Sequence, residues 1–299
     1  MSTRSPAETA RRTAEALDRT IFFVVGCQKS GTTWLQRLLN AHPEVVCRGE
    51  HQLCNVLLPM GVALVREWSG KINAPAPTKL DNADAPDVVR LVSGLLFAKW
   101  AGDEMSTLRA IGEKTPQHAY ALPALSQLFP GCRVIHIIRD GRDCVVSGWY
   151  HNKRDNPLDH ERRFPSRAVY AKYFAEHHWV PYISKARAWG QPHAQQYREV
   201  RYETMLEHPE STVESLLSFL GVDNSRGAVE TCIQAASFEK LSRGRTRGEA
   251  DDNSFFRKGV AGDWHDELDA EAVAAFESIG APLMLELGYE PVSTVAKAG

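Results

Sequence analysis

The sequence lacks both a charge imbalance and long apolar runs. Its 35 lysines and arginines nearly match its 37 aspartates and glutamates over 299 residues. Because the chain has no overall basic character, nothing favours nucleic acid or an anionic membrane as a partner, and any anion site has to be local. The best apolar run, residues 56–65, is interrupted by Pro59 and Gly61, and it falls short of the roughly 18 residues typical of a membrane span. We therefore expect no membrane span.

Closely spaced cysteine pairs are also missing. No C-x-x-C spacing occurs, and several of the cysteines lie in apolar stretches typical of a core; they are Cys27, Cys47, Cys54, Cys132, Cys144 and Cys232. This pattern predicts reduced thiols and argues against zinc or any other metal site. Residues 2–20 contain Glu8, Glu15 and Asp18 and lack an apolar centre, unlike a secretion signal. These features favour a cytoplasmic protein.

Strand-like and helix-like segments alternate along the chain. The strand-like runs are residues 21–26, 108–113, 133–138 and 199–202, and the helix-like segments include residues 34–41, 84–100, 144–150 and 269–287. This alternation predicts an α/β fold in which a central parallel sheet is flanked by helices. No linker argues clearly for two domains. We expect a flexible lead-in at residues 1–20, one domain at residues 21–292 and a tail at residues 293–299.

The most informative stretch, residues 26–34, reads GCQKSGTTW and joins a strand-like run to a helix-like one. Small residues at such a junction direct backbone N–H groups and the positive end of a helix dipole to one point, which suits a phosphate. Gly26 and Gly31 have the spacing of the nucleoside-triphosphate motif G-x-x-x-x-G-K-[ST], but Thr32 stands at the lysine position. The only lysine, Lys29, precedes the second glycine. An ATP-type site and an ordinary strand–loop–helix turn remain the alternatives.

Two further stretches also combine cations with a turn. At the end of a strand-like run, Arg139 offers a planar fork of donors, and Ser147 offers a hydroxyl about two helical turns later. Residues 256–264 read FRKGVAGDW. The junction at Arg139 therefore favours a second anion site.

Taken together, these stretches resemble the sulfotransferases that use 3'-phosphoadenosine 5'-phosphosulfate (PAPS). The loop is similar to that family's P-K-S-G-T-T-W, with Gln28 in place of proline. Residues 139–147 match its R-(x)7-S pattern, and residues 257–264 reproduce its R-K-G-x-x-G-D-W. Weaker similarities at residues 201–205 (RYETM) and 236–238 (ASF) follow in the family's order. The resemblance implies a single α/β domain with a P-loop-like nucleotide site.

The resemblance also implies which residues hold PAPS. Lys29 would contact the transferring sulfuryl, and the 5'-phosphate would be held by Ser30, Gly31, Thr32 and Thr33. The 3'-phosphate would be bound by Arg139, Ser147, Arg257, Lys258 and Gly259. Adenine would be held by Trp34, Tyr202, Ser237 and Phe238.

For the reaction, the resemblance implies two lysines and a base. Lys29 and Lys114 would stabilise the sulfuryl oxygens and the leaving phosphate. Pro116 stands where the small-molecule enzymes of the family have a histidine base. Residues 39–51 resemble the segment in which tyrosylprotein and heparan sulfotransferases use a glutamate. The candidates for the base, in order, are Glu50, His51 and then, as outsiders, Glu113 and His118.

The expected function is transfer of the sulfuryl group of PAPS to a hydroxyl or amine of a small-molecule or glycan acceptor, leaving 3'-phosphoadenosine 5'-phosphate (PAP). An ATP- and Mg²⁺-dependent P-loop kinase and a non-catalytic nucleotide-binding module are the alternatives. Residues 53–70 and 150–182 are expected to line the acceptor pocket, and their aromatic content does not choose the acceptor. Residues 241–254 are expected to be mobile, with a role as a lid left open, as is a homo-oligomer.

Overall fold

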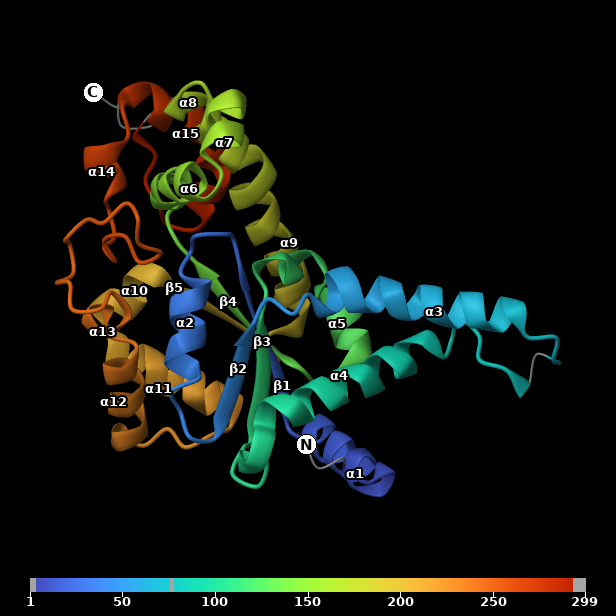
Figure 1. Cartoon of the computed structure of the whole chain (residues 1–299). Coiled ribbons are helices and arrows are strands. Elements are labelled where there is room, and N and C mark those ends of the chain that lie inside the picture. Colours follow the sequence, from blue (N-terminus) through green and yellow to red (C-terminus); the bar gives the residue numbers. More distant parts are fainter. Residues whose placement is uncertain (1–3, 76–77, 293–299) are drawn as a thin grey trace.

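A five-stranded parallel sheet forms the centre of the molecule (Figure 1). The computed structural model describes residues 4–75 and 78–292, so the tail expected at residues 293–299 lies outside the described residues. The strands are β1 (Thr20–Gly26), β2 (Val45–Gly49), β3 (Ala110–Lys114), β4 (Arg133–Ile138) and β5 (Tyr197–Arg201). Their spatial order is β2-β3-β1-β4-β5, and every neighbouring pair is parallel. The predicted α/β fold class is confirmed.

Both faces of the sheet are buried, because alternate residues of β1 enter two separate cores. Phe23 and Val25 belong to one core and Phe22 and Val24 to the other. The first core includes residues of α4 (Ala85–Ala101), α5 (Leu122–Leu128), α6 (Gly141–Asp155), α8 (Arg167–Phe174), α9 (Val180–Gly190) and α15 (Ala270–Glu286). The second includes residues of α2 (Thr32–Leu39), α10 (Tyr202–Glu207), α11 (Pro209–Leu220) and α12 (Arg226–Ala235).

Shorter elements complete the chain. They are α7 (Pro157–Arg163), α13 (Phe238–Leu241), α14 (Trp264–Glu267), the single turns η3 (Gly102–Glu104), η4 (Pro116–Tyr120) and η6 (Gln191–His193), and the π-helical turns η1 (Leu53–Leu57) and η5 (Ala175–Trp179). Figure 1 shows α3 (Leu58–Lys71) extending away from the sheet above α4. Across residues 4–75 and 78–292, none of the helices combines the length and apolar character needed to cross a membrane.

The expected N-terminal lead-in contains a packed helix, α1 (Pro6–Leu17). Ser5 caps it by accepting a hydrogen bond from the N–H of Glu8, and Thr13 and Ala16 are buried. The side chains of Thr13 and Leu17 lie so close to Gly94 of α4 that an added Cβ there would approach them at 2.8 Å. The lead-in was expected to be frayed and partly helical, and residues 6–17 are instead a packed helix, because their partner on α4 lies about 80 residues away, where the local sequence does not reveal it.

The carboxyl ends of the strands meet at one edge of the sheet, since all five strands are parallel. From this edge β1 leads into α2, β3 into η4, β4 into α6 and β5 into α10. Asp140 begins α6 by accepting a hydrogen bond from the N–H of Arg142 at 2.9 Å. Ligands of open α/β sheets bind at this edge, and the candidate site lies here.

Candidate active site

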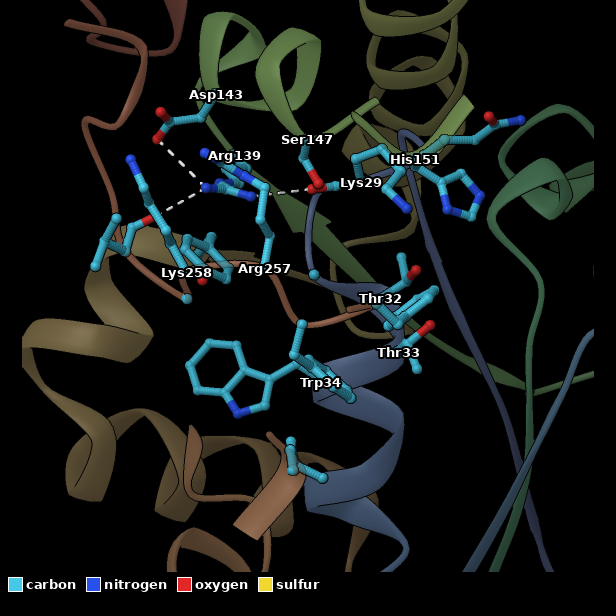
Figure 2. A pocket seen from close by; sticks show the side chains of 18 of the residues that line it. Lys29, Thr32, Thr33, Trp34, Arg139, Asp143, Ser147, His151, Arg257 and Lys258 are labelled. Atoms are coloured by element: carbon cyan, nitrogen blue, oxygen red, sulfur yellow. Dashed lines mark hydrogen bonds and ion pairs between the residues drawn. The ribbon is translucent and has the colours of Figure 1, made fainter. Parts of the chain in front are cut away.

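One cavity of about 300 Å³ opens at this edge of the sheet. It is bordered by the β1–α2 loop, Glu50, the start of η4, α6, Tyr202, α13 and the loop that precedes α14. Figure 2 shows Lys29 and His151 on one side of it and Arg257 and Lys258 on the other. The structure therefore brings both expected anion-binding regions to a single cavity.

The β1–α2 loop depends on two glycines. Gly26 has φ 156°, and a Cβ there would lie 2.5 Å from the carbonyl oxygen of Ile137. Gly31 has φ 101° and begins α2, and a Cβ there would lie 2.7 Å from the ring of Tyr202. Each position combines a left-handed backbone with a close approach, which favours glycine. Gly31, Thr32, Thr33 and Trp34 border the cavity as predicted.

Ser30 shapes the loop from inside. Its hydroxyl donates to the carbonyl oxygen of Cys27 at 2.7 Å, and its side chain is buried. Ser30 does not border the cavity in this structure. The resemblance assigned Ser30 to the 5'-phosphate, and in this structure its hydroxyl is bonded to Cys27 within the loop.

Lys29 reaches into the cavity from a left-handed backbone of φ 69°. Its Nζ atom lies 4.8 Å from the centre of the Phe255 ring. Burial, and then the positive charge of Arg154, lower the pKa of Lys29, and the carboxylate of Asp155 opposes them; the net pKa is about 8. Lys29 is therefore a cation that titrates close to neutral pH, unlike a lysine in water.

Arg139 holds the two anion-binding loops together. Its guanidinium donates to the carbonyl oxygen of Lys29 at 3.3 Å and to that of Val260 at 2.8 Å. It also lies 3.6 Å from the carboxylate of Asp143 and 4.3 Å from the centre of the Tyr202 ring. Arg139 borders the cavity as predicted, but several of its donors serve the protein backbone. Ser147, also predicted, borders the cavity nearby (Figure 2).

Arg257 and Lys258, the other cations expected at a 3'-phosphate, are paired with carboxylates. Arg257 contacts Asp263 and lies 2.9 Å from Glu267, and Lys258 lies 2.6 Å from Asp263 and 3.1 Å from Glu267. Burial raises the pKa of Glu267, but hydrogen bonds from Tyr150, Arg257 and Lys258 outweigh it and lower the pKa to about 2. Glu267 is therefore ionised at neutral pH, and an anion that binds these cations has to compete with it.

The backbone of this loop is fixed by its neighbours. Gly259 has φ 69°, and a Cβ there would lie 2.3 Å from the Phe238 ring. The carboxylate of Asp143 accepts hydrogen bonds from the N–H groups of Gly262 at 2.8 Å and Trp264 at 3.0 Å. Arg247 donates to the carbonyl oxygen of Gly259 at 2.9 Å. Sequence reasoning placed Gly259 here but assigned no role to Asp143 or Arg247.

Aromatic side chains form the part of the cavity expected to hold adenine. The indole N–H of Trp34 donates to the carbonyl oxygen of Ala236 at 2.9 Å, and the Trp34 and Tyr202 rings meet edge to face at 5.3 Å. Phe238 also borders the cavity. Ser237, in contrast, caps α13 by accepting from the N–H of Lys240 and does not border the cavity.

Of the two first candidates for the base, only Glu50 borders the cavity. Its backbone is left-handed, with φ 56°, and its N–H donates to the carbonyl oxygen of Lys114 at 2.8 Å. Its carboxylate forms an ion pair with the Nζ atom of Lys114. His51 instead packs against Trp100, with ring centres 4.6 Å apart, and does not border the cavity.

Lys114 is buried behind Glu50 and does not border the cavity itself. In this structure it acts on Glu50, whereas the sequence assigned it to the sulfuryl group. The reason lies in the turn after β2, which brings Glu50 across the end of β3 and which the sequence of β3 alone does not reveal.

Glu113 and His118 are fully buried away from the cavity. The carboxylate of Glu113 accepts hydrogen bonds from Thr115 at 2.7 Å and His118 at 2.8 Å, and from the N–H of Gln52, whose φ is 57°. Burial raises the pKa of Glu113, but these hydrogen bonds and the charge of His118 outweigh it, so the net pKa is lowered. Glu113 therefore secures the far end of the turn that carries Glu50.

Several residues that border the cavity were missed. Gln28, Gln117, Asp143, His151, Arg247, Phe255 and Phe256 all line it. Helical spacing is a signal for His151, because it follows Ser147 by one helical turn. Of the segments expected to line the acceptor pocket, residues 150–182 contribute His151 to the described lining, while α3 and η1 contribute no residue to it.

The segment expected to be mobile, residues 241–254, is tied to the loop that follows it. Arg245 donates to the carbonyl oxygen of Arg257 at 2.7 Å and to the hydroxyl of Ser254 at 2.8 Å. The N–H of Gly248 donates to the carbonyl oxygen of Lys258 at 3.0 Å. The segment thus forms part of the cavity wall, because its arginines find backbone partners that only the folded chain provides.

Comparison with known proteins places these features in a family. Residues 19–288 match the family model described as the sulfotransferase domain. The chain is 26% identical over 273 residues to cytosolic sulfotransferase 11 of Arabidopsis thaliana, covering 84% of this chain and 69% of that one. It is 26% identical over 285 residues to the nodulation protein NoeE of Sinorhizobium fredii, covering 90% and 66%.

Solved structures agree on the fold. Mouse sulfotransferase SULT7A1 complexed with PAP superposes with a TM-score of 0.57 at 18% identity, covering 93% of this chain and 90% of that one. Sulfotransferase STF9 from Mycobacterium avium gives a TM-score of 0.54 at 14% identity, covering 95% and 81%. The match of the family model to most of the sequence, and the shared fold, lead to one conclusion: this chain belongs to the sulfotransferase family.

Proposed function

We propose that this protein transfers the sulfuryl group of PAPS to an acceptor hydroxyl by in-line displacement and releases PAP. One observation carries the proposal: a single cavity is bordered by Lys29 and Glu50 on one side and by Arg257 and Lys258 on the other. A donor with a reactive 5' end and a separate 3'-phosphate engages both sides. ATP has no 3'-phosphate that could engage Arg257 and Lys258. The PAP complex of the mouse relative supports the same donor.

The residues divide the chemistry between them. The acceptor oxygen forms a bond to sulfur as the bond between sulfur and the phosphate oxygen breaks, and the acceptor proton passes to the carboxylate of Glu50. The charge of Lys29 stabilises the sulfuryl oxygens and the departing phosphate. The charge of Lys114 orients Glu50 through their ion pair. These assignments depend on the placement of the side chains around the cavity.

Binding of the 3'-phosphate requires an exchange of partners. Arg257 and Lys258 are held by Asp263 and Glu267 in this structure, so the phosphate replaces or joins these carboxylates. The N–H groups beside Gly259 contribute without such an exchange. The adenine ring lies between Trp34 and Phe238, whose side chains border the same part of the cavity.

We further propose a hydroxyl of a small molecule or glycan as the acceptor and the cytoplasm as the location. The location is supported by six cysteines that are all free and buried, as in a reducing compartment, and by relatives named as cytosolic sulfotransferases. An expected oligomeric partner has no support of this kind and is left out of the proposal.

Calorimetry and one variant test the proposed function. We expect PAP to bind without metal and more tightly than ATP with Mg²⁺. We expect Lys29→Ala to abolish transfer of labelled sulfuryl while PAP affinity stays within about tenfold, because the side chain acts mainly on charge that develops in the transition state. Lys172→Ala, on an exposed side chain of α8, is the matched control. Tighter binding of ATP with Mg²⁺, or full activity of Lys29→Ala, contradicts the proposal.

A further inference from the structure

The cavity wall around Lys29 and Glu50 is rich in hydrogen-bonding side chains. Besides these two residues, this end is bordered by Gln28, Pro116, Gln117, His151 and Phe255. Gln28 directly precedes Lys29, and Gln117 follows the β3 end that holds Glu50. His151 lies close enough to Lys29 and Glu50 to feel the charge of both. The part of the cavity in which the acceptor substrate would bind is therefore polar.

His151 presents a hydrogen-bond donor at this place. Arg154 lies 2.7 Å from its Nδ1 atom, and because arginine can only donate, Nδ1 has to accept and the neutral ring carries its proton on Nε2. Burial lowers the pKa of His151 and the charge of Lys29 lowers it further, which favours this neutral form. The carboxylate of Asp155 lies 3.5 Å from Nε2, beyond ordinary hydrogen-bond length. The Nε2–H group is thus held only by this long contact with Asp155, and an oxygen of the substrate competes with that carboxylate for it.

Gln28 and Gln117 add amide groups that both donate and accept. The side chain of Gln28 shares a hydrogen bond with the hydroxyl of Tyr182, which fixes its orientation. The Oε1 atom of Gln117 has no hydrogen-bond partner within the described chain. This oxygen is also buried, and an unpaired buried amide oxygen costs free energy. A substrate hydroxyl recovers this cost once the Gln117 side chain turns its oxygen toward the cavity, which Gln117 borders.

Of the aromatic residues expected at the acceptor site, Tyr182 bonds to Gln28 but does not border the cavity itself, and Tyr150 lies elsewhere, as does the adjacent Trp149. Tyr150 points its hydroxyl to Glu267, 2.7 Å away, at the opposite end of the cavity. Trp149 packs edge to face on His160 and Tyr170. Phe255, over which Lys29 lies, and its neighbour Phe256, 5.2 Å away between ring centres, both border the cavity. A flat aromatic acceptor that stacked on these rings would still leave the amides and the imidazole without hydrogen-bond partners.

We propose that the acceptor is a polyhydroxylated molecule of the carbohydrate class. Its reacting hydroxyl lies at Glu50, and its neighbouring hydroxyls bond to Gln28, Gln117 and His151. The proposal rests on the sulfuryl-transfer function proposed above. It narrows the acceptor by the chemistry of the wall, because a site built to hydrogen-bond a substrate hydroxyl rejects analogues that lack it.

Matched acceptors test this proposal. The full chain is assayed with labelled PAPS, with a panel of methyl glycosides and chito- and malto-oligosaccharides, with their monodeoxy analogues, and with phenols and cyclohexanols. We expect transfer to one class of glycoside in preference to every phenol, and a loss of about tenfold or more in kcat/KM when a hydroxyl next to the reacting one is removed.

Variants of the wall provide a second readout. We expect Gln28→Leu, Gln117→Leu and His151→Phe each to lower kcat/KM for the preferred glycoside by about tenfold, with unchanged affinity for PAP, which also reports that the variant is folded. Gln191→Leu, at an exposed glutamine of η6, is the control.

The outcomes separate the two proposals. Transfer to no glycoside, preferential transfer to phenols, or equal rates for the deoxy analogues together with fully active wall variants overturns the carbohydrate assignment, while PAP binding still stands. If PAP itself does not bind, the sulfuryl-transfer function fails, and the acceptor proposal fails with it.

Discussion

At the scale of single residues, Lys29 carries the most consequential property of the site. Its Nζ atom is buried beside Arg154 and Phe255, and its pKa is lowered to about 8. The charged form is therefore complete only well below pH 8, and it is lost as the pH rises through that value. Because the charge is needed at the sulfuryl group, activity should depend on pH in a range where most lysines stay protonated.

The first prediction follows from this titration. We expect kcat/KM for PAPS to fall tenfold per pH unit above about pH 8, because this parameter reports groups of the free enzyme. The fall of kcat with pH (the alkaline limb of its pH profile) should lie at higher pH, since a bound anionic donor raises the pKa of Lys29. Lys29→Arg, whose guanidinium stays charged, is the informative control: whatever its residual activity, its profile should lack the limb. An unchanged limb in this variant assigns the titration to another group.

Many of the residues that the sequence assigned to the site border the cavity, but the directions of some side chains could not be read from the sequence. Trp34, Arg257 and Glu50 border the cavity as the sequence indicated. Ser30 matches the loop motif, yet its hydroxyl turns inward to Cys27. His51 adjoins Glu50, yet it packs on Trp100, a residue of a helix far along the chain. A motif fixes where the backbone passes, whereas the side chain follows partners that come from distant segments.

At the scale of elements, the end of β3 controls the turn that carries Glu50. Lys114 holds Glu50 by an ion pair and by its carbonyl oxygen. Glu113, pointing to the other face of the strand, accepts a hydrogen bond from the N–H of Gln52. Glu50 and Gln52 both have left-handed backbones, a conformation that persists only when its surroundings impose it. Two successive side chains of one strand thus secure both ends of one strained turn.

The second prediction tests Glu113 as a positioning residue. We expect Glu113→Gln to lower kcat by roughly 10- to 100-fold, because a small misplacement of a reacting group is enough for such a loss. The KM for PAPS and the affinity for PAP should stay unchanged, since Glu113 lies away from the cavity. Glu230→Gln, on an exposed pair with Arg226, is the matched control. If Glu113→Gln lowers the affinity for PAP as much as it lowers kcat, the substitution destabilises the whole fold, and Glu113 is not a positioning residue.

The elements themselves were largely predictable, and the exceptions have physical causes. Four of the strands appear where the apolar runs placed them, with bounds shifted by up to two residues. Strand β2 was missed because its strand character comes from pairing with β3, about 60 residues later in the chain. Helix α1 was expected to be loose because its burial depends on Gly94 of α4. In both cases the decisive contact is distant in sequence.

At the scale of the whole molecule, the cavity links segments from the entire chain. Its wall runs from Gln28 to Asp263, and Arg139 connects its two anion-binding loops through the backbones of Lys29 and Val260. A ligand that bridges these loops binds only the folded chain, so it should stabilise the whole domain by mass action. The 3'-phosphate should add its own part of this stabilisation, because Arg257 and Lys258 lie on a different loop from Lys29.

The third prediction uses this coupling. At a concentration of 100 times its Kd, PAP should stabilise the protein by about 2.7 kcal/mol, measured as a rise in Tm that grows with ligand concentration. Adenosine 5'-monophosphate, which lacks the 3'-phosphate, should give a smaller rise at the same concentration. In Arg257→Ala the difference between the two nucleotides should shrink, because one of the cations assigned to the 3'-phosphate is gone, while Arg226→Ala, at a side chain 91% exposed, should retain the full difference. Equal rises in Tm with both nucleotides in the unmodified protein would show that Arg257 and Lys258 stay bound to Asp263 and Glu267 when the donor enters. The assignment of the 3'-phosphate to these two cations would then be wrong.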